Sequence, residues 1–151
     1  MKTFESIDEV LDFAMQSEQD AVDFYTQLAT RMKNEEIKQV FLQFAREEVG
    51  HKARLQQIKD ERVFDFQPEV VKDLKIADYV VQDKPHDNME YADALVLAMK
   101  REKAAFKLYT TLAERTENES LKNTFQALAI EESKHKLRFE IEYDDFVMRE
   151  N

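Results

Sequence analysis

The chain repeats itself at an offset of 84 residues, and this duplication constrains the fold more than any other feature of the sequence. Of the 37 positions from Glu18 to Arg54, 17 carry the same residue as the position 84 places later. Two unrelated helices can share apolar spacing, but they do not share Tyr, Asn, Glu and His at one fixed offset. We therefore interpret the chain as a duplicated helix-turn-helix, which predicts two similar hairpins around a pseudo-twofold axis. The matched pairs include Glu18/Glu102, Ala21/Ala105, Tyr25/Tyr109, Asn34/Asn118, Phe41/Phe125, Glu48/Glu132, His51/His135 and Arg54/Arg138.

The composition favours long helices and excludes several classes of site. The 151 residues include one Gly and two Pro, so residues that interrupt helices are scarce. Cysteine is absent, which excludes disulfides, zinc-thiolate sites, iron–sulfur clusters and a cysteine nucleophile. The formal net charge of −10 argues against general binding to nucleic acid, which needs Lys and Arg to neutralise phosphates. No signal peptide or membrane span is visible, so we expect a cytoplasmic protein that does not bind a membrane.

Apolar residues recur at helical spacing through most of the chain and predict four long helices. Ser6 followed by Glu9 predicts a capping box at the first of them, and Asp87 with Glu90 predicts a cap at the third. Turns are expected near Asn34 and Asn118. The expected helices span about residues 7–33, 36–62, 89–116 and 119–148.

A segment of different character, residues 63–87, separates the two hairpins and contains both prolines. Within it, residues 69–79 are compatible with a short helix. A helix of about 27 residues is about 40 Å long, and an extended linker of about 25 residues can span that length. We therefore predict one domain over residues 1–151, with hairpins at about 6–62 and 88–148. Its fold class is all-α, a ferritin-like antiparallel four-helix bundle with one long crossover between the second and third helices.

Each expected helix has one continuous apolar face that is interrupted only at its middle by ligand-type residues. A buried ionised carboxylate costs several kcal/mol unless it is paired or binds a metal. Four such acids in one core would repel one another, and two divalent cations would neutralise them. The interrupting residues are Glu18 in the first helix, Glu48 and His51 in the second, Glu102 in the third, and Glu132 and His135 in the fourth.

The spacing of these residues agrees with a metal site. In Glu48-x-x-His51 the two side chains lie three positions apart on one side of a helix, and the second hairpin repeats the motif. Mixed carboxylate and imidazole ligands suit Fe or Mn. The neighbouring acids Glu47 and Glu131 could compete for the ligand role, but they lie at the flank of the apolar stripe, so we favour Glu48 and Glu132.

The ordered set of motifs resembles the rubrerythrin branch of the ferritin-like superfamily over almost the whole chain. This resemblance implies a non-haem site of two Fe ions that reacts with O2 or hydrogen peroxide. It also implies that Glu48 and Glu132 bridge the metals, that Glu18 and His51 complete one iron site, and that Glu102 and His135 complete the other. The motifs are Glu18-x-x-Ala21-x-x-x-Tyr25, Glu47-Glu48-x-x-His51, Glu102-x-x-Ala105-x-x-x-Tyr109 and Glu131-Glu132-x-x-His135.

The chain departs from relatives in this superfamily in three respects. Full-length rubrerythrins carry a four-cysteine rubredoxin-like part, and this chain has no cysteine, so we expect a separate electron-donor protein. Ala105 stands where rubrerythrins tend to place a further Glu, which leaves the choice between peroxidase and ferroxidase open. Val49 stands where bacterioferritin has its haem-binding Met, so we expect no haem.

The leading functional hypothesis is therefore an oxidoreductase with a di-iron centre, and we expect it to be a homodimer. Two alternatives stay open from the sequence: an iron-storage or iron-handling ferritin-like protein, and a non-enzymatic helical interaction module. Tyr25 and Tyr109 are either neighbours of the metal ligands or large core residues with one polar partner.

Overall fold

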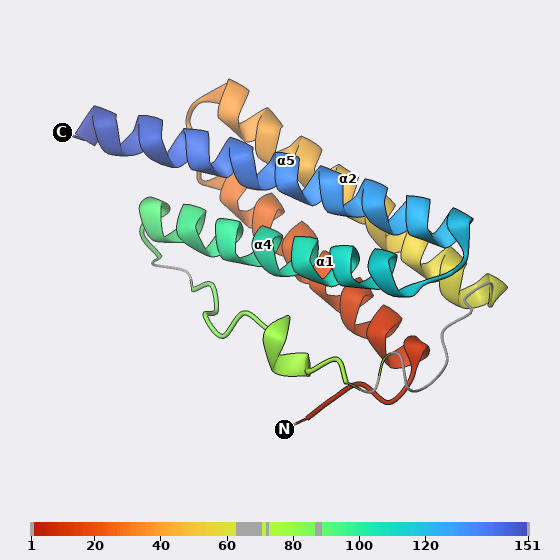
Figure 1. Cartoon of the computed structure of the whole chain (residues 1–151). Helices are drawn as coiled ribbons and strands as arrows, with labels where there is room; N and C mark the ends of the chain where they lie inside the picture. The colour runs from red at the N-terminus through yellow and green to blue at the C-terminus, as the bar shows by residue number, and fades with distance from the viewer. Residues whose placement is uncertain (1, 63–70, 72, 87–88, 151) are drawn as a thin grey trace. The chain divides into compact units, whose positions relative to one another are not determined.

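The computed structural model describes residues 2–62, 71, 73–86 and 89–150. Within these residues the long helices are α1 (Ile7–Thr30), α2 (Glu35–Glu61), α4 (Tyr91–Arg115) and α5 (Glu119–Glu150), and a short 3-10 helix, η1, spans Ile76–Asp78 (Figure 1). The chain divides into two compact units. The N-terminal unit is Phe4–Asp73, and the C-terminal unit is Met1–Thr3 with Leu74–Asn151. Each unit contains one copy of the sequence repeat, while the grouping of both copies into one domain stays a prediction.

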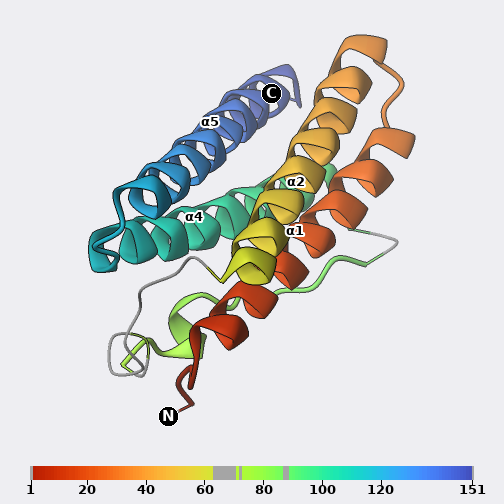
Figure 2. The same cartoon turned by 90° about the vertical axis from the view of Figure 1, so that its right-hand side faces the viewer.

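The N-terminal unit is an antiparallel hairpin in which α1 packs against α2 (Figures 1 and 2). The hydroxyl of Ser6 accepts a hydrogen bond from the Glu9 N–H at 3.2 Å, which confirms Ser6 as the cap of α1. The side chain of Asn34 accepts one from the Ile37 N–H at 3.1 Å, so the residue expected in the turn is the N-cap of α2. Capping of this kind satisfies N–H groups that have no partner inside the helix.

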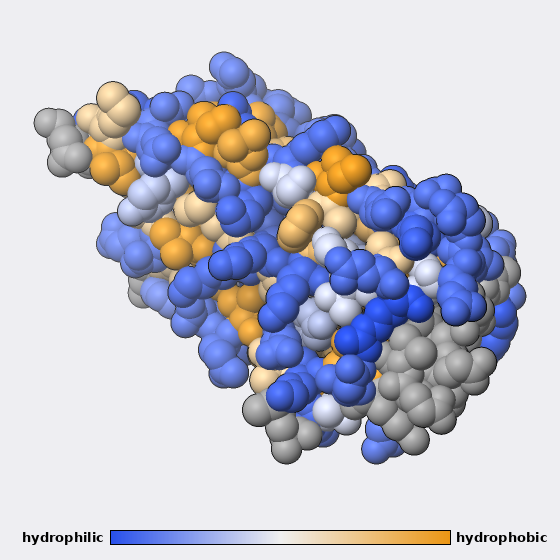
Figure 3. Space-filling model, viewed as in Figure 1, coloured by the Kyte–Doolittle hydropathy of each residue, from blue (hydrophilic) through white to orange (hydrophobic). Residues whose placement is uncertain are grey.

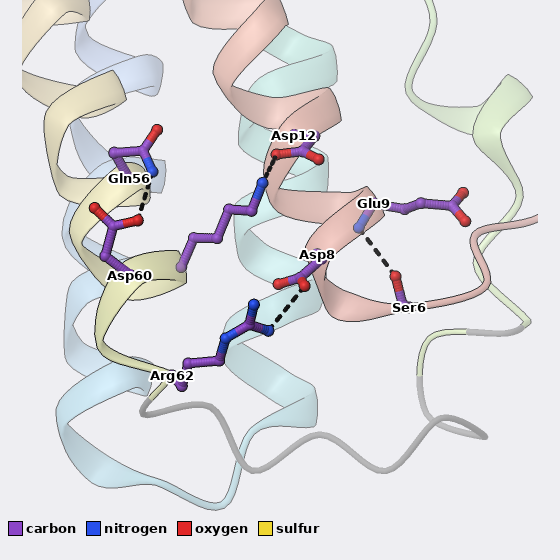
Figure 4. Close-up of polar contacts among 8 residues, drawn as sticks. Ser6, Asp8, Glu9, Asp12, Gln56, Asp60 and Arg62 are labelled. Atoms are coloured by element: carbon purple, nitrogen blue, oxygen red, sulfur yellow. Dashed lines mark hydrogen bonds and ion pairs between the residues drawn. The ribbon is translucent and has the colours of Figure 1, made fainter.

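Two ion pairs join the end of α2 to the beginning of α1. Nη1 of Arg62 lies 2.9 Å from Oδ2 of Asp8, and Nζ of Lys59 lies 2.7 Å from Oδ1 of Asp12 (Figure 4). Arg62 ends α2 in the left-handed conformation, with φ 52 and ψ 38. That conformation is unfavourable for a residue with a Cβ. The ion pairs are largely exposed, so their contribution to stability is small.

The C-terminal unit is the second hairpin, in which α4 packs against α5. Oδ1 of Asn118 accepts a hydrogen bond from the Leu121 N–H at 3.0 Å, so Asn118 caps α5 as its counterpart Asn34 caps α2. The start of α4 differs from the expectation: its N-cap is Glu90, which makes no side-chain capping bond, and the predicted cap Asp87 lies outside the described residues. Of the short helix expected over residues 69–79, the structure describes a helical residue at Val71 and the turn of η1, while residues 69, 70 and 72 lie outside the description.

The core of each hairpin follows the predicted apolar stripe. The largest buried side chains in the N-terminal unit include Leu11, Tyr25, Phe41 and Leu55, and those in the C-terminal unit include Leu95, Tyr109, Phe125 and Phe139. Four residues that helical spacing places on the apolar faces, Met32, Ile37, Phe44 and Ala105, are only half-buried. The surface in Figure 3 is mostly hydrophilic, with smaller hydrophobic patches. None of the helices formed by the described residues combines the length and the apolar character needed to cross a bilayer.

Candidate metal centre

Three ligand-type side chains meet inside the N-terminal unit: Glu18 from α1 and Glu48 with His51 from α2, here called the N-terminal triad. All three are buried, with exposed fractions of 2%, 2% and 0%. One ligand atom from each lies within 4.8 Å of the others. Nδ1 of His51 is 3.2 Å from Oε1 of Glu48 and 3.6 Å from Oε2 of Glu18. The two side chains of the Glu-x-x-His motif and the acid of the neighbouring helix therefore come together, as the sequence predicts.

The second hairpin contains the equivalent C-terminal triad: Glu102 from α4 and Glu132 with His135 from α5. Their exposed fractions are 1%, 1% and 2%, and one ligand atom from each lies within 4.8 Å of the others. Nδ1 of His135 is 3.6 Å from Oε1 of Glu102. The duplication thus reproduces the cluster of acid, acid and imidazole as well as the helices.

Small residues accompany both acids on the first helix of each hairpin. Ala14 and Ala21 lie one turn before and one turn after Glu18, and Ala98 and Ala105 hold the same positions around Glu102. Small side chains on either side leave room for a carboxylate and whatever it binds. Ala21 and Ala105 already belong to the motifs of the repeat, and Ala14 and Ala98 hold equivalent positions at the same 84-residue offset.

The electrostatic environment of the N-terminal triad favours the binding of positive charge beside its two carboxylates. Burial, and then the charge of Glu48, raise the pKa of Glu18 well above its usual value. Burial alone would lower the pKa of His51, but hydrogen bonds and charge from Glu18 and Glu48 outweigh it and raise the pKa to about 10. The triad therefore has two acids for one imidazole, which is one carboxylate more than a single protonated histidine can balance.

The acids adjacent to the triads lie in a different environment. Glu47 and Glu131 are half-buried, whereas Glu48 and Glu132 are almost completely buried. Burial therefore agrees with the preference for Glu48 and Glu132, although the assignment of ligands stays a prediction. The third histidine of the chain, His86, is exposed and lies outside both triads.

The two tyrosines of the repeat are core residues in both units. Tyr25 is 0% exposed and its ring lies 6.4 Å from that of Phe44, while Tyr109 is 1% exposed and stacks on Phe125 at 6.5 Å. These contacts show that both tyrosine rings pack in the core of their hairpins. A role for the hydroxyls beside the ligands stays a prediction.

Gly50 does not serve a close helix approach. A Cβ added at this position would meet no atom within 4 Å, and the residue is exposed. Glycine is therefore not required here to let another element pack beside the motif.

The donor set of the triads fits a metal ion. Carboxylate oxygens and imidazole nitrogens are the ligands of non-haem iron and manganese, and no softer thiolate is present in the sequence. Each triad brings two carboxylates and one imidazole close together in a buried position, which is part of the ligand set that one metal ion needs.

Comparison with known proteins places the fold in a class. A Thermotoga maritima protein described as ferritin-like and diiron-carboxylate matches with a TM-score of 0.74 at 20% sequence identity, over 92% of this chain and 94% of that chain. A hypothetical protein from Pyrococcus furiosus matches with a TM-score of 0.73 at 27% identity, over 92% of this chain and 89% of that one. The predicted fold class is confirmed: the fold is an all-α, ferritin-like antiparallel four-helix bundle with helix pairs α1·α2 and α4·α5.

The sequence comparison defines the family. The family model described as Rubrerythrin matches residues 9–143, which include both copies of the repeat and all six triad residues. The chain belongs to the rubrerythrin family, which confirms the resemblance that the motifs indicated. A search of curated proteins finds no significant match.

Proposed function

We propose that the protein is a non-haem di-iron oxidoreductase in which the two triads together hold two iron ions and react Fe(II) with O2 or hydrogen peroxide. The observation that carries this proposal is the presence of one buried set of two carboxylates and one imidazole in each hairpin. Family membership and the ferritin-like fold support it, because members of this class build a metal site from the facing helices of the bundle.

Each residue type has a defined task in this proposal. The four carboxylates, Glu18 and Glu48 in one unit and Glu102 and Glu132 in the other, would supply the negative charge that two divalent ions need. His51 and His135 would supply one neutral nitrogen each. When a metal binds, His51 therefore has to release the proton that its raised pKa retains in the metal-free protein. Burial of all six side chains limits access of bulk water to the site. When bound, two ferrous ions supply the two electrons that reduction of hydrogen peroxide to water consumes.

The source of the electrons is a separate part of the proposal. Because the sequence contains no cysteine, this chain has no thiolate-bound redox centre of its own. We assign re-reduction of the iron to a separate electron-donor protein. Manganese suits the same ligands and is the alternative metal.

Metal analysis followed by a redox assay tests the proposal. Protein purified without chelator is expected to hold about two metal ions per chain, and anaerobic Fe(II) loading is expected to reach the same ratio. On addition of hydrogen peroxide or O2, the absorbance of bound iron should change faster than that of free Fe(II) in the same buffer. The variant His51→Ala with His135→Ala, checked for helix content by circular dichroism, should lose both the binding and the rate.

Two outcomes would overturn the proposal or redirect it. If the folded protein binds fewer than two ions, or if the double variant binds as many as the wild type, the triads do not form the centre. If native mass measurement instead gives a large cage that takes up many iron ions per chain, the protein belongs to the iron-storage alternative.

A further inference from the structure

Helix α5 is apolar on two opposite faces, and only one of them packs within its hairpin. The inner face includes Phe125, Leu128 and Phe139, each 0% exposed. The opposite face carries four large apolar residues with high exposed fractions: Ile130 at 53%, Leu137 at 57%, Ile141 at 43% and Met148 at 75%. In the view of Figure 3, orange patches separated by blue ones recur along the course that α5 takes in Figure 1.

These residues form a regular seam. Together with the exposed residues Lys134 and Asp144 they occupy positions 130, 134, 137, 141, 144 and 148, here called the outer stripe. Successive members are separated alternately by four and three residues, which is the spacing of the a and d positions in a coiled coil. Phe139, at the centre of this segment, is fully buried on the other side of the helix, so the outer stripe lies directly opposite the hairpin core.

The outer stripe of one α5 is complementary to the same stripe of a second α5 that runs in the opposite direction. Counted from position 139, Leu137 and Ile141 lie two residues to either side, and Ile130 and Met148 lie nine residues to either side. Both pairs are apolar. Lys134 and Asp144 lie five residues to either side, and their charges are opposite. In an antiparallel pair of helices centred on residue 139, every a position therefore meets a d position of matching character.

We propose that the outer stripe of α5 is the interface of a homodimer, in which α5 pairs in antiparallel fashion with α5 of a second copy about residue 139. The layers of the interface are then Ile130 with Met148 of the partner subunit, Lys134 with Asp144 of the partner subunit, and Leu137 with Ile141 of the partner subunit. Twofold symmetry repeats each layer once, so the interface has four apolar layers and two ionic ones.

A second copy explains features that a different partner would not require. A twofold interface joins the same patch on both subunits, so the patch must be complementary to itself, and this one is. Neither Lys134 nor Asp144 forms an ion pair within the described part of the chain, so both charges are available to a partner. Opposite charges inside an apolar seam also fix direction and register, since a parallel pairing would place Lys134 against Lys134 and Asp144 against Asp144. The proposal rests on α5 alone and is independent of the metal.

Cysteine cross-linking tests the direction and the register. The chain has no native cysteine, so introduced thiols report without background. Ile130 and Met148 are 18 residues apart, about 27 Å along the helix, whereas a disulfide needs Cα atoms within about 7 Å. We expect neither Ile130→Cys nor Met148→Cys to cross-link with itself, and an equal mixture of the two, exchanged and then oxidised, to give a covalent dimer. Self-cross-linking of either single variant, or no cross-linking in the mixture, would overturn the antiparallel register.

Charge reversal tests the ionic layers by sedimentation equilibrium of the full chain. Each of Lys134→Glu and Asp144→Lys places like charges in two layers and should weaken dimerisation about tenfold or more, and the double variant should restore it. Leu137→Glu removes a central apolar layer and should weaken dimerisation at least about a hundredfold. The matched control is Phe106→Glu on α4, an exposed apolar residue outside the stripe at 41% exposure, which should leave the dimer unchanged.

The remaining outcomes also decide the question. A wild-type chain that stays monomeric at millimolar concentration, or a dimer that Leu137→Glu leaves intact, refutes the proposal. A chain that is monomeric alone but forms a complex with another protein through this face shows that the stripe serves a different partner, which equally refutes pairing with a second copy.

Discussion

Replacing Glu48 by Gln is expected to change stability in opposite directions with and without metal. Glu48 is 2% exposed and its charge contributes to the raised pKa of Glu18. In the metal-free protein the triad contains one acid more than His51 can balance, and Gln removes that acid at almost the same volume. We expect the metal-free variant to be more stable than the wild type by about 1–3 kcal/mol.

The metal-loaded protein should respond the other way because the variant has lost a ligand. A metal present at 100 times its dissociation constant stabilises the folded state by about 2.7 kcal/mol. For a chain of 151 residues, 1 kcal/mol corresponds to a melting-temperature shift of about 3 °C, so the wild type should gain about 8 °C on loading. Glu48→Gln should lose most of this gain while its metal-free melting temperature rises.

Thermal unfolding with and without Mn(II), an ion that suits the same ligands and avoids the oxidation chemistry of iron, measures both effects. The matched control is Glu47→Gln, because Glu47 is adjacent in sequence and only half-buried. This variant should keep the gain on loading and change metal-free stability by less than about 0.5 kcal/mol. The reasoning is refuted if Glu47→Gln abolishes the gain while Glu48→Gln retains it, or if both variants retain it in full.

Three further predictions test the fold around the centre. Gly50→Ala should stabilise the protein by about 1 kcal/mol, since the added methyl group meets no atom within 4 Å and helix propensity improves, and a lower melting temperature would contradict this. Asn34→Ala and Asn118→Ala should each cost about 1 kcal/mol in denaturant unfolding through loss of equivalent capping bonds, so an effect in only one of them would show that the two hairpins do not share their caps. Leu55→Ala, at a position 0% exposed on α2, should cost about 2–5 kcal/mol through the cavity it leaves, and a cost below about 1 kcal/mol in the same assay would show that this core is not tightly packed.

The positions of the helices and the candidate ligands could be predicted from the sequence because they depend on local patterns. Helical spacing places Glu18, Glu48 and His51 on apolar faces wherever the helices finally pack. The duplication then supplied a second, independent copy of the same pattern. The start of α4 was predicted about two residues too early, at residue 89 instead of Tyr91, and Glu90 begins this helix without a side-chain capping bond.

The 84-residue repeat determined by itself that the chain contains two equivalent hairpins, each with two acids and one imidazole on an inward face. The apolar stripe also favoured Glu48 over Glu47 as the inward residue, and the tertiary structure agrees, because Glu48 is buried while Glu47, 100° away around the same helix, is half-buried. Only the tertiary structure decided that a second apolar face of α5 stays uncovered in its hairpin. Ile130, Leu137 and Ile141 are as apolar as Phe125 and Leu128, so hydropathy alone does not show whether they are covered. The position of α4 makes the distinction, since it covers one face and leaves the outer stripe exposed.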